Sequence, residues 1–128
     1  LRYLKKIFYN SVAELRDIQY CDFRGNVKNG NGYNTIIEHA TLIPQEVHLA
    51  FPKNVNAYLA NFVSLGILFD MVGTYRIDQT IYNKIKEFYG FEKLKTQLAP
   101  NVFKEVVANN SYYKVTDFGK LFIQACIK

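Results

Sequence analysis

The chain has 128 residues, of which 49% are hydrophobic and 21% are charged, and it contains ten Phe, ten Tyr and no Trp. These numbers predict one compact domain and exclude a disordered tail, because the chain holds enough aromatic and branched residues to form a core. The net charge of +5 permits a nucleic-acid partner without indicating one, since residues 1–64 carry seven basic and five acidic side chains and residues 65–128 carry nine and six.

No apolar stretch approaches the roughly 18 residues that a membrane-spanning helix needs. The longest, Val63 to Met71, is interrupted by polar residues and a glycine. The two cysteines, Cys21 and Cys126, are too few for a disulfide framework, which favours free thiols in a cytoplasmic protein. Because the chain begins at Leu1 and its one methionine is Met71, we expect a single domain over residues 1–128 that forms the C-terminal portion of a longer protein.

The first third of the chain is predicted to be helix, loop and helix. Apolar residues recur at three- and four-residue steps from Leu1 to Ile18, which predicts an amphipathic helix. The glycine- and asparagine-rich segment Cys21–Asn34 predicts a loop. A short helix is expected over Asn34–Ile43, and a strand over Thr41–Val47 is the alternative.

The middle of the chain predicts a capped helix followed by extended structure. Val55–Leu65 has one apolar face, a cap at Asn54 or Asn56, and Gly66 as the residue that ends the helix. Ile67–Phe69 and Val72–Ile77 are expected to be strands or extended segments.

Two helices are predicted next. Asp78 is expected to cap a helix that reaches Tyr89 and ends at Gly90, and a short helical turn follows over Phe91–Leu98 before Pro100.

The last part of the chain predicts a β-hairpin and a helix. Val102–Val107 and Tyr112–Val115 are the two expected strands, joined by a turn at Asn109–Ser111, and Thr116 caps the final helix. These elements predict an α+β domain that is mostly helical and similar to a winged helix, with the hairpin as a small wing and a C-terminal helix.

The residue types that carry catalysis form no complete motif. The glycine loop lacks the Lys and the Ser or Thr that must follow the second glycine of a P-loop. Glu38, His39 and His48 are the residues around which a hydrolase or nuclease would have to be built, but two histidines without the spacing of a zinc site favour structural roles. We therefore predict no catalytic residue, no metal site and no cofactor.

Nucleic-acid contact has its best candidate in the segment before and along the Asp78–Tyr89 helix. Arg76, Lys84 and Lys86 place positive charge beside an apolar face there. The ten tyrosines could stack on single-stranded bases, but without an alternating aromatic and basic pattern we expect them to pack their rings against the core.

The most specific pattern lies in two blocks, Asn54–Leu68 and Val115–Cys126. Its defining residues are Leu65, Gly66, Thr116, Phe118, Gly119, Phe122, Ala125 and Cys126. With these blocks the chain resembles the abortive infection alpha (Abi-alpha) family, a bacterial domain of unknown function associated with antiviral defence against phage. Leu1–Asp17 also resembles the helix that opens this domain.

The resemblance implies a biological setting and no catalytic site. It implies a non-enzymatic bacterial domain that acts by protein or nucleic-acid contact. One alternative is a protein-interaction or dimerisation module unrelated to defence, in which an exposed Tyr-rich patch docks a partner or a second copy; another is a hydrolase or nuclease. The matched residues are expected to be structural, with Phe118 and Phe122 facing the core and Cys126 a small buried side chain.

Overall fold

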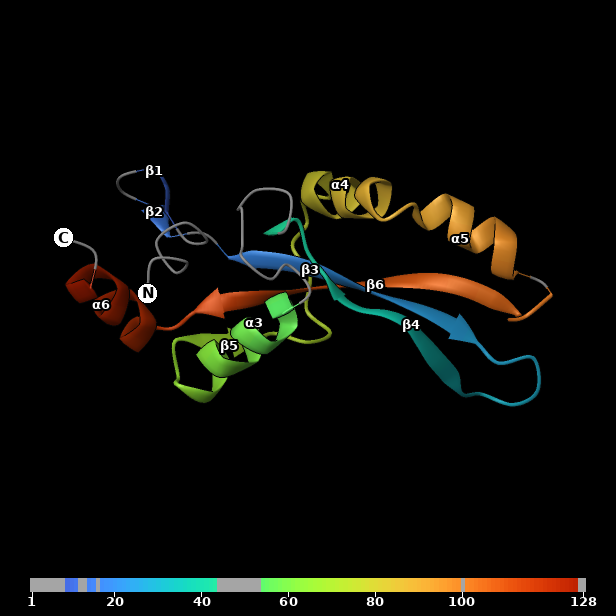
Figure 1. Ribbon diagram of the computed structural model, residues 1–128, viewed down its shortest axis with the longest axis horizontal. Helices are drawn as coiled ribbons and strands as arrows, with labels where there is room; N and C mark the ends of the chain where they lie inside the picture. The colour runs from blue at the N-terminus through green and yellow to red at the C-terminus, as the bar shows by residue number, and fades with distance from the viewer. Residues whose placement is uncertain (1–8, 12–13, 16, 44–53, 100, 127–128) are drawn as a thin grey trace. The chain divides into compact units, whose positions relative to one another are not determined.

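The computed structural model describes residues 9–11, 14–15, 17–43, 54–99 and 101–126 (Figure 1). In chain order the elements are β1 (Tyr9–Ser11), β2 (Glu14–Leu15), β3 (Ile18–Asn26), β4 (Tyr33–Ala40), α3 (Val55–Ser64), β5 (Leu68–Asp70), α4 (Thr80–Phe88), α5 (Phe91–Leu98), β6 (Glu105–Val115) and α6 (Asp117–Cys126). Strands β1 and β2 pair with each other, and the other four form an antiparallel sheet in the order β4-β3-β6-β5.

The prediction of a mostly helical, winged-helix-like domain is wrong. The described residues form a four-stranded antiparallel sheet with four helices, and the expected wing is absent from them. In place of the hairpin, β6 runs without interruption from Glu105 to Val115. Asn109–Ser111 does not turn, because tertiary partners satisfy its polar side chains: Asn110 bonds to Cys21 and Gln79, and the hydroxyl of Ser111 accepts the N–H of Gly73.

Three further predictions fail where strand pairing overrides the local pattern. Tyr9–Ser11, Glu14–Leu15 and Ile18 are strand where a helix is predicted, and residues 1–8 of that helix lie outside the described residues. Of the predicted loop, Cys21–Asn26 forms the last six of the nine residues of β3. Asn34–Ala40 is strand rather than helix because it pairs with β3.

The alternative of a strand over Thr41–Val47 also fails for Thr41–Ile43, and its remainder lies outside the described residues. Val72–Ile77 contains no strand residues. The predictions of α3, α4, α5 and α6 are confirmed, as is a strand that includes Leu68 and Phe69.

The chain divides into two compact units. The first comprises the described parts of residues 1–18, 43–72 and 112–128, and the second comprises residues 19–42 and the described parts of 73–111. The strands β3 and β6 each contribute residues to both units.

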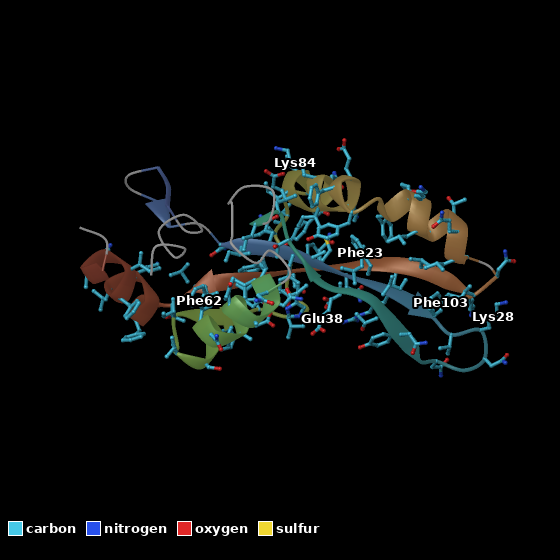
Figure 2. The ribbon with its side chains drawn as sticks, viewed as in Figure 1. Phe23, Lys28, Glu38, Phe62, Lys84 and Phe103 are labelled. Atoms are coloured by element: carbon cyan, nitrogen blue, oxygen red, sulfur yellow. The ribbon has the colours of Figure 1, made fainter. Side chains whose placement is uncertain are left out.

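The core of the second unit forms where α4 and α5 cover one face of the sheet (Figure 1). Its buried members are Cys21, Phe23, Ala40, Leu42, Tyr82, Ile85, Phe91 and Val106. Phe23 lies beneath the helices in Figure 2, with its ring centroid 5.0 Å from that of Phe91. Since side chains alternate along a strand, Tyr20, Asp22 and Arg24 belong to the opposite face of β3.

The end of α4 at Gly90 is confirmed, whereas its N-cap is Gln79 and not the predicted Asp78. The helix begins at Thr80, whose backbone N–H and hydroxyl donate to the carboxylate of Asp78 at 2.9 and 2.6 Å. The hydrogen bond from the Thr80 side chain and then that from its backbone lower the pKa of this carboxyl. At the other end, Gly90 adopts a φ of 66°, a left-handed conformation that glycine reaches without steric cost.

Candidate functional site

In the first unit, a joint centred on Thr116 connects the end of α3 to the start of α6. The Thr116 N–H donates to the carbonyl of Ile67 at 3.0 Å, and its hydroxyl donates to the carbonyl of Gly66 at 2.5 Å. The same hydroxyl oxygen accepts the N–H of Gly119 at 2.8 Å, which is the N-cap hydrogen bond expected of Thr. One side chain therefore joins two segments that lie 50 residues apart in the sequence.

Gly119 completes the joint by allowing a close approach of the two backbones. A Cβ at this position would overlap the carbonyl oxygen of Ile67. Ile123, one turn further along α6, is fully buried and anchors the helix. The position of α6 is thus set by a cap, a backbone contact and one apolar anchor.

The same joint leaves large apolar side chains at the surface. Leu65 is 63% exposed, Phe118 55% and Leu121 68%. Phe118 lies next to the end of α3, since a Cβ at Gly66 would be 3.9 Å from its ring, and its ring centroid is 6.1 Å from that of the half-buried Phe122. We call Leu65, Phe118 and Leu121 the α6 surface.

This arrangement corrects the predicted orientation of α6. Phe118 points to solvent, not to the core, and Phe122 is only partly buried. Gly119 and Ile123 face inward in their place. The structure does bring Leu65, Gly66, Thr116, Phe118 and Gly119 together, as their shared pattern suggests, but the side chain of Cys126 lies outside the described part of the chain.

In the second unit, a polar cluster forms around the buried carboxylate of Asp22, which is 6% exposed. The backbone N–H of His39 donates to Asp22 Oδ1 at 2.8 Å, and a guanidinium nitrogen of Arg24 lies 3.5 Å from Oδ2. The imidazole of His39 has its Nε2 3.9 Å from Oδ1, and its ring stacks 4.2 Å from that of the fully buried Tyr20. The sequence analysis does not single out Asp22 as a site residue. The one available signal is its position two residues after Tyr20 and two before Arg24, which places the three side chains on one face of a strand.

The residues proposed for a hydrolase or nuclease do not assemble a metal centre in the described chain. Glu38 is exposed on β4 (Figure 2), His39 belongs to the Asp22 cluster, and His48 lies outside the described residues. Among the described residues there is no group of three or more His, Cys, Asp or Glu side chains that could hold a metal ion.

Cys21 lies on the opposite face of β3 and is a buried free thiol. Its Sγ lies 3.3 Å from Oδ1 of Asn110, whose amide nitrogen donates to Gln79 at 3.0 Å. Burial, partly offset by the charge of Lys86, raises the pKa of Cys21 to about 12. Cys21 is therefore a structural thiol, connected through Asn110 to Gln79, the residue before α4.

The three predicted nucleic-acid contacts do not share one helix face. Arg76 is exposed but precedes α4, and its backbone N–H donates to the hydroxyl of Tyr82 at 3.0 Å. Lys84 is exposed and points away from the sheet (Figure 2). Lys86 is half-buried, with its Nζ 6.0 Å from the ring centroid of Phe91.

The turn between β3 and β4 is solvent-exposed. The hairpin is closed by the Val27 N–H, which donates to the carbonyl of Gly32 at 3.0 Å. An open hollow of about 270 Å³ lies beside this turn and is lined mainly by polar groups, among them Asn26, Lys104 and Glu105. Asn26 donates to the Glu105 carboxylate at 3.4 Å.

No helix in the described ranges has both the length and the apolar character needed to cross a membrane.

Replacing Gly119 tests the joint, because local and tertiary effects have opposite signs. In an exposed helix interior, Gly→Ala stabilises by about 1 kcal/mol. At Gly119 the new Cβ meets the backbone of Ile67, so Gly119→Ala should lower the free energy of unfolding by about 1–3 kcal/mol. Urea denaturation measures this, with Lys120→Ala, at an exposed site on the same helix, as the control. A Gly119→Ala variant more stable than the native chain would contradict the close contact.

The buried thiol of Cys21 should be unreactive in the folded protein. At pH 8 a pKa of about 12 leaves about one thiolate in ten thousand. In a Cys126→Ser background, a disulfide reagent should modify Cys21 only on the timescale of unfolding. Because the folded pKa is raised, the stability that the protonated thiol contributes is complete below about pH 9 and is lost as the pH rises toward 12. Rapid modification at pH 8 would disprove the burial.

Comparison with known proteins gives the chain its family. No curated protein matches the sequence. Among solved structures, the chain is similar to an uncharacterized protein from the hydrocarbon-degrading marine bacterium Alcanivorax borkumensis SK2, with 11% identity, coverage of 99% of this chain and 83% of that chain, and a TM-score of 0.49. The sequence pattern of the family described as abortive infection alpha matches residues 1–126. The chain therefore belongs to the abortive infection alpha family.

Proposed function

We propose that this domain contributes to abortive infection in bacteria by docking a protein through the α6 surface. The family supplies the setting, since the match covers nearly the whole chain. The observation that carries the proposal is the exposure of Leu65, Phe118 and Leu121 by more than half. Large apolar side chains gathered at the surface of a folded protein are typical of interaction sites.

The construction of the surface supports docking. The Thr116 cap and the contact between Gly119 and Ile67 fix α6 before any partner arrives. A preformed surface loses less conformational entropy on binding than a mobile one. Phe118 and Leu121 are one turn apart on α6, which is the spacing at which side chains of one helix reach a partner together.

Charge placement also fits a protein partner. The charged residues of α6 are Asp117 and Lys120, one of each sign. Helix α6 itself therefore carries no net positive charge that would favour a polyanion. Apolar anchors within a mixed polar surround are the usual composition of a protein–protein interface.

Leu121→Lys tests this proposal in the full-length protein. Inserting a charge at an apolar contact should cost about 2 kcal/mol, or roughly thirtyfold in affinity. Bacteria that express the variant should lose protection against phage, measured as efficiency of plating. Ile77→Lys is the matched control, because Ile77 is 92% exposed and belongs to the second unit. Circular dichroism melts establish that both variants fold.

Two outcomes separate the alternatives. If Leu121→Lys folds and protects as well as the native protein, docking through α6 in defence is disproved. Sedimentation of the native and Leu121→Lys proteins then tests the alternative of an interaction module unrelated to defence. If the native protein self-associates and Leu121→Lys abolishes this without changing the efficiency of plating, the α6 surface binds a second copy of the chain and has no role in defence.

The second candidate function is nucleic-acid contact near α4. The observation that favours it is the projection of Lys84 away from the sheet, with Arg76 and part of Lys86 also at the surface. These residues do not form one face, so a polyanion would have to reach them around the beginning and outer side of the helix.

Charge reversal with a salt series tests this second candidate. The double variant Lys84→Glu/Lys86→Glu should weaken binding of a short DNA duplex. It should also reduce the slope of log affinity against log salt by about one for each phosphate that the protein no longer neutralises. Lys114→Glu, an exposed lysine of the first unit, is the control. An affinity that does not respond to salt, or to the double variant, would exclude contact through these lysines.

A further inference from the structure

The tip of the β3–β4 hairpin contains two asparagine-glycine pairs in succession, Asn29-Gly30 and Asn31-Gly32. All four residues are exposed to solvent. Glycine has no Cβ and reaches conformations that other residues avoid, so it obstructs the side chain of the preceding residue least. In such a pair the asparagine side chain can therefore meet the nitrogen of the following peptide bond.

This meeting leads to a defined reaction that needs only water. The glycine nitrogen attacks the side-chain carbonyl carbon of the asparagine, a carbon–nitrogen bond forms, and the side-chain nitrogen leaves as ammonia with the proton that the glycine nitrogen loses. Water then opens the resulting succinimide ring. Opening at the side-chain carbonyl gives aspartate, and opening at the backbone carbonyl gives isoaspartate. One water is consumed, one ammonia is released, and nothing is oxidised or reduced.

The surroundings of Asn29-Gly30 leave this pair free to reach the reactive geometry. Among the described residues, none forms a hydrogen bond or an ion pair with either member of the pair. Gly30 has a φ of 100°, and no described atom lies within 4 Å of the place that a Cβ on it would occupy. Rotation of the peptide bond between the two residues therefore breaks no contact with the rest of the described chain.

Asn31-Gly32 is held more firmly because it adjoins the last hydrogen bond of the hairpin. The carbonyl of Gly32 accepts the N–H of Val27 at 3.0 Å. The side chain of Val27 also lies 3.8 Å from the place that a Cβ on Gly32 would occupy. Formation of a succinimide at Asn31 would move Gly32 and strain this hydrogen bond, so the structure favours Asn29 as the first residue to react.

Asn110-Ser111 shows how the fold protects an asparagine that also precedes a small residue. Its amide nitrogen donates to Gln79 at 3.0 Å, and its amide oxygen accepts from the thiol of Cys21 at 3.3 Å. Ser111 is buried, and its hydroxyl accepts the N–H of Gly73. The side chain and its successor are thus both fixed within β6, in contrast to the pairs at the hairpin tip.

We propose that the β3–β4 tip is a site of spontaneous deamidation, at which Asn29 reacts first and forms mainly isoaspartate, the group that isoaspartyl carboxyl methyltransferases modify. Each conversion replaces a neutral amide by a carboxylate, so the net charge of +5 falls to +4 after the first. The product lies beyond the hydrogen bond between Val27 and Gly32, so the core of the second unit keeps its packing. This inference concerns a different part of the chain from α6 and does not depend on the proposed function.

Incubation of the native full-length protein at neutral pH and physiological temperature tests the proposal. Peptide mapping by mass spectrometry should locate the first deamidated residue at Asn29, and an isoaspartyl methyltransferase with labelled S-adenosylmethionine should transfer label to the same peptide. Asn29 should react roughly tenfold faster than Asn31, since the attack needs a near-attack geometry that the anchored pair reaches less often. The rate should rise with pH, because the glycine nitrogen attacks after it loses its proton.

Two matched substitutions and an unfolded control separate the fold from the local sequence. Asn29→Gln should remove most of the early label, because glutamine must close a larger ring and reacts more slowly, whereas Asn31→Gln should retain it. In concentrated urea, where the hairpin is lost, Asn29 and Asn31 should react at similar rates. The proposal is overturned if the native protein accumulates no isoaspartate at Asn29, or if Asn31 reacts as fast as Asn29 in the native state.

Discussion

The hydroxyl of Thr116 is the interaction on which the arrangement of the first unit depends. It donates to the carbonyl of Gly66, just beyond α3, and accepts the N–H of Gly119 in the first turn of α6, so one oxygen connects the end of one helix to the start of another. A hydroxyl can do both because it is donor and acceptor at once. Valine has nearly the same shape as threonine but can neither donate nor accept a hydrogen bond. Position 116 therefore depends on the hydroxyl and not on the volume of the side chain. The exposure of Phe118 and Leu121 follows from this placement of α6.

The elements that were predictable from sequence are those with local causes. Helix α3 ends where Gly66 adopts a φ of 79°, and α6 begins at a threonine cap; both signals lie within four residues of the feature they determine. The predictions for β3 and β4 are wrong although the two strands pair with each other, because glycine and asparagine near the end of β3 favour a loop and the local pattern of β4 favours a helix. Asn109–Ser111 shows the limit of local signals: its composition is that of a turn, and the groups that hold it straight are Gln79 and Gly73, which lie 31 and 38 residues away from their partners.

The candidate site was predictable in membership but not in orientation. The motif residues around Gly66 and Thr116 do meet. The face of α6 was mispredicted because aromatic periodicity favoured Phe118 and Phe122 as the buried side, whereas the close backbone approach at Gly119 turns Ile123 inward. The role of Asp22 is hard to predict for a different reason: alternation with Tyr20 and Arg24 is a weak signal, and its partner His39 contributes a backbone amide that no sequence motif marks.

The hairpin tip between β3 and β4 has a consequence for how the chain can change length. Every residue from Lys28 to Asn34 is exposed, and Lys28 lies at the tip of the hairpin in Figure 2. The hydrogen bond from the Val27 N–H to the Gly32 carbonyl already closes the pairing of β3 with β4. The entropy of loop closure grows only slowly with loop length. Residues inserted between Asn29 and Gly30 would project into solvent and leave the core of the second unit untouched. This tip is therefore where relatives of the chain could acquire extra segments without losing the fold.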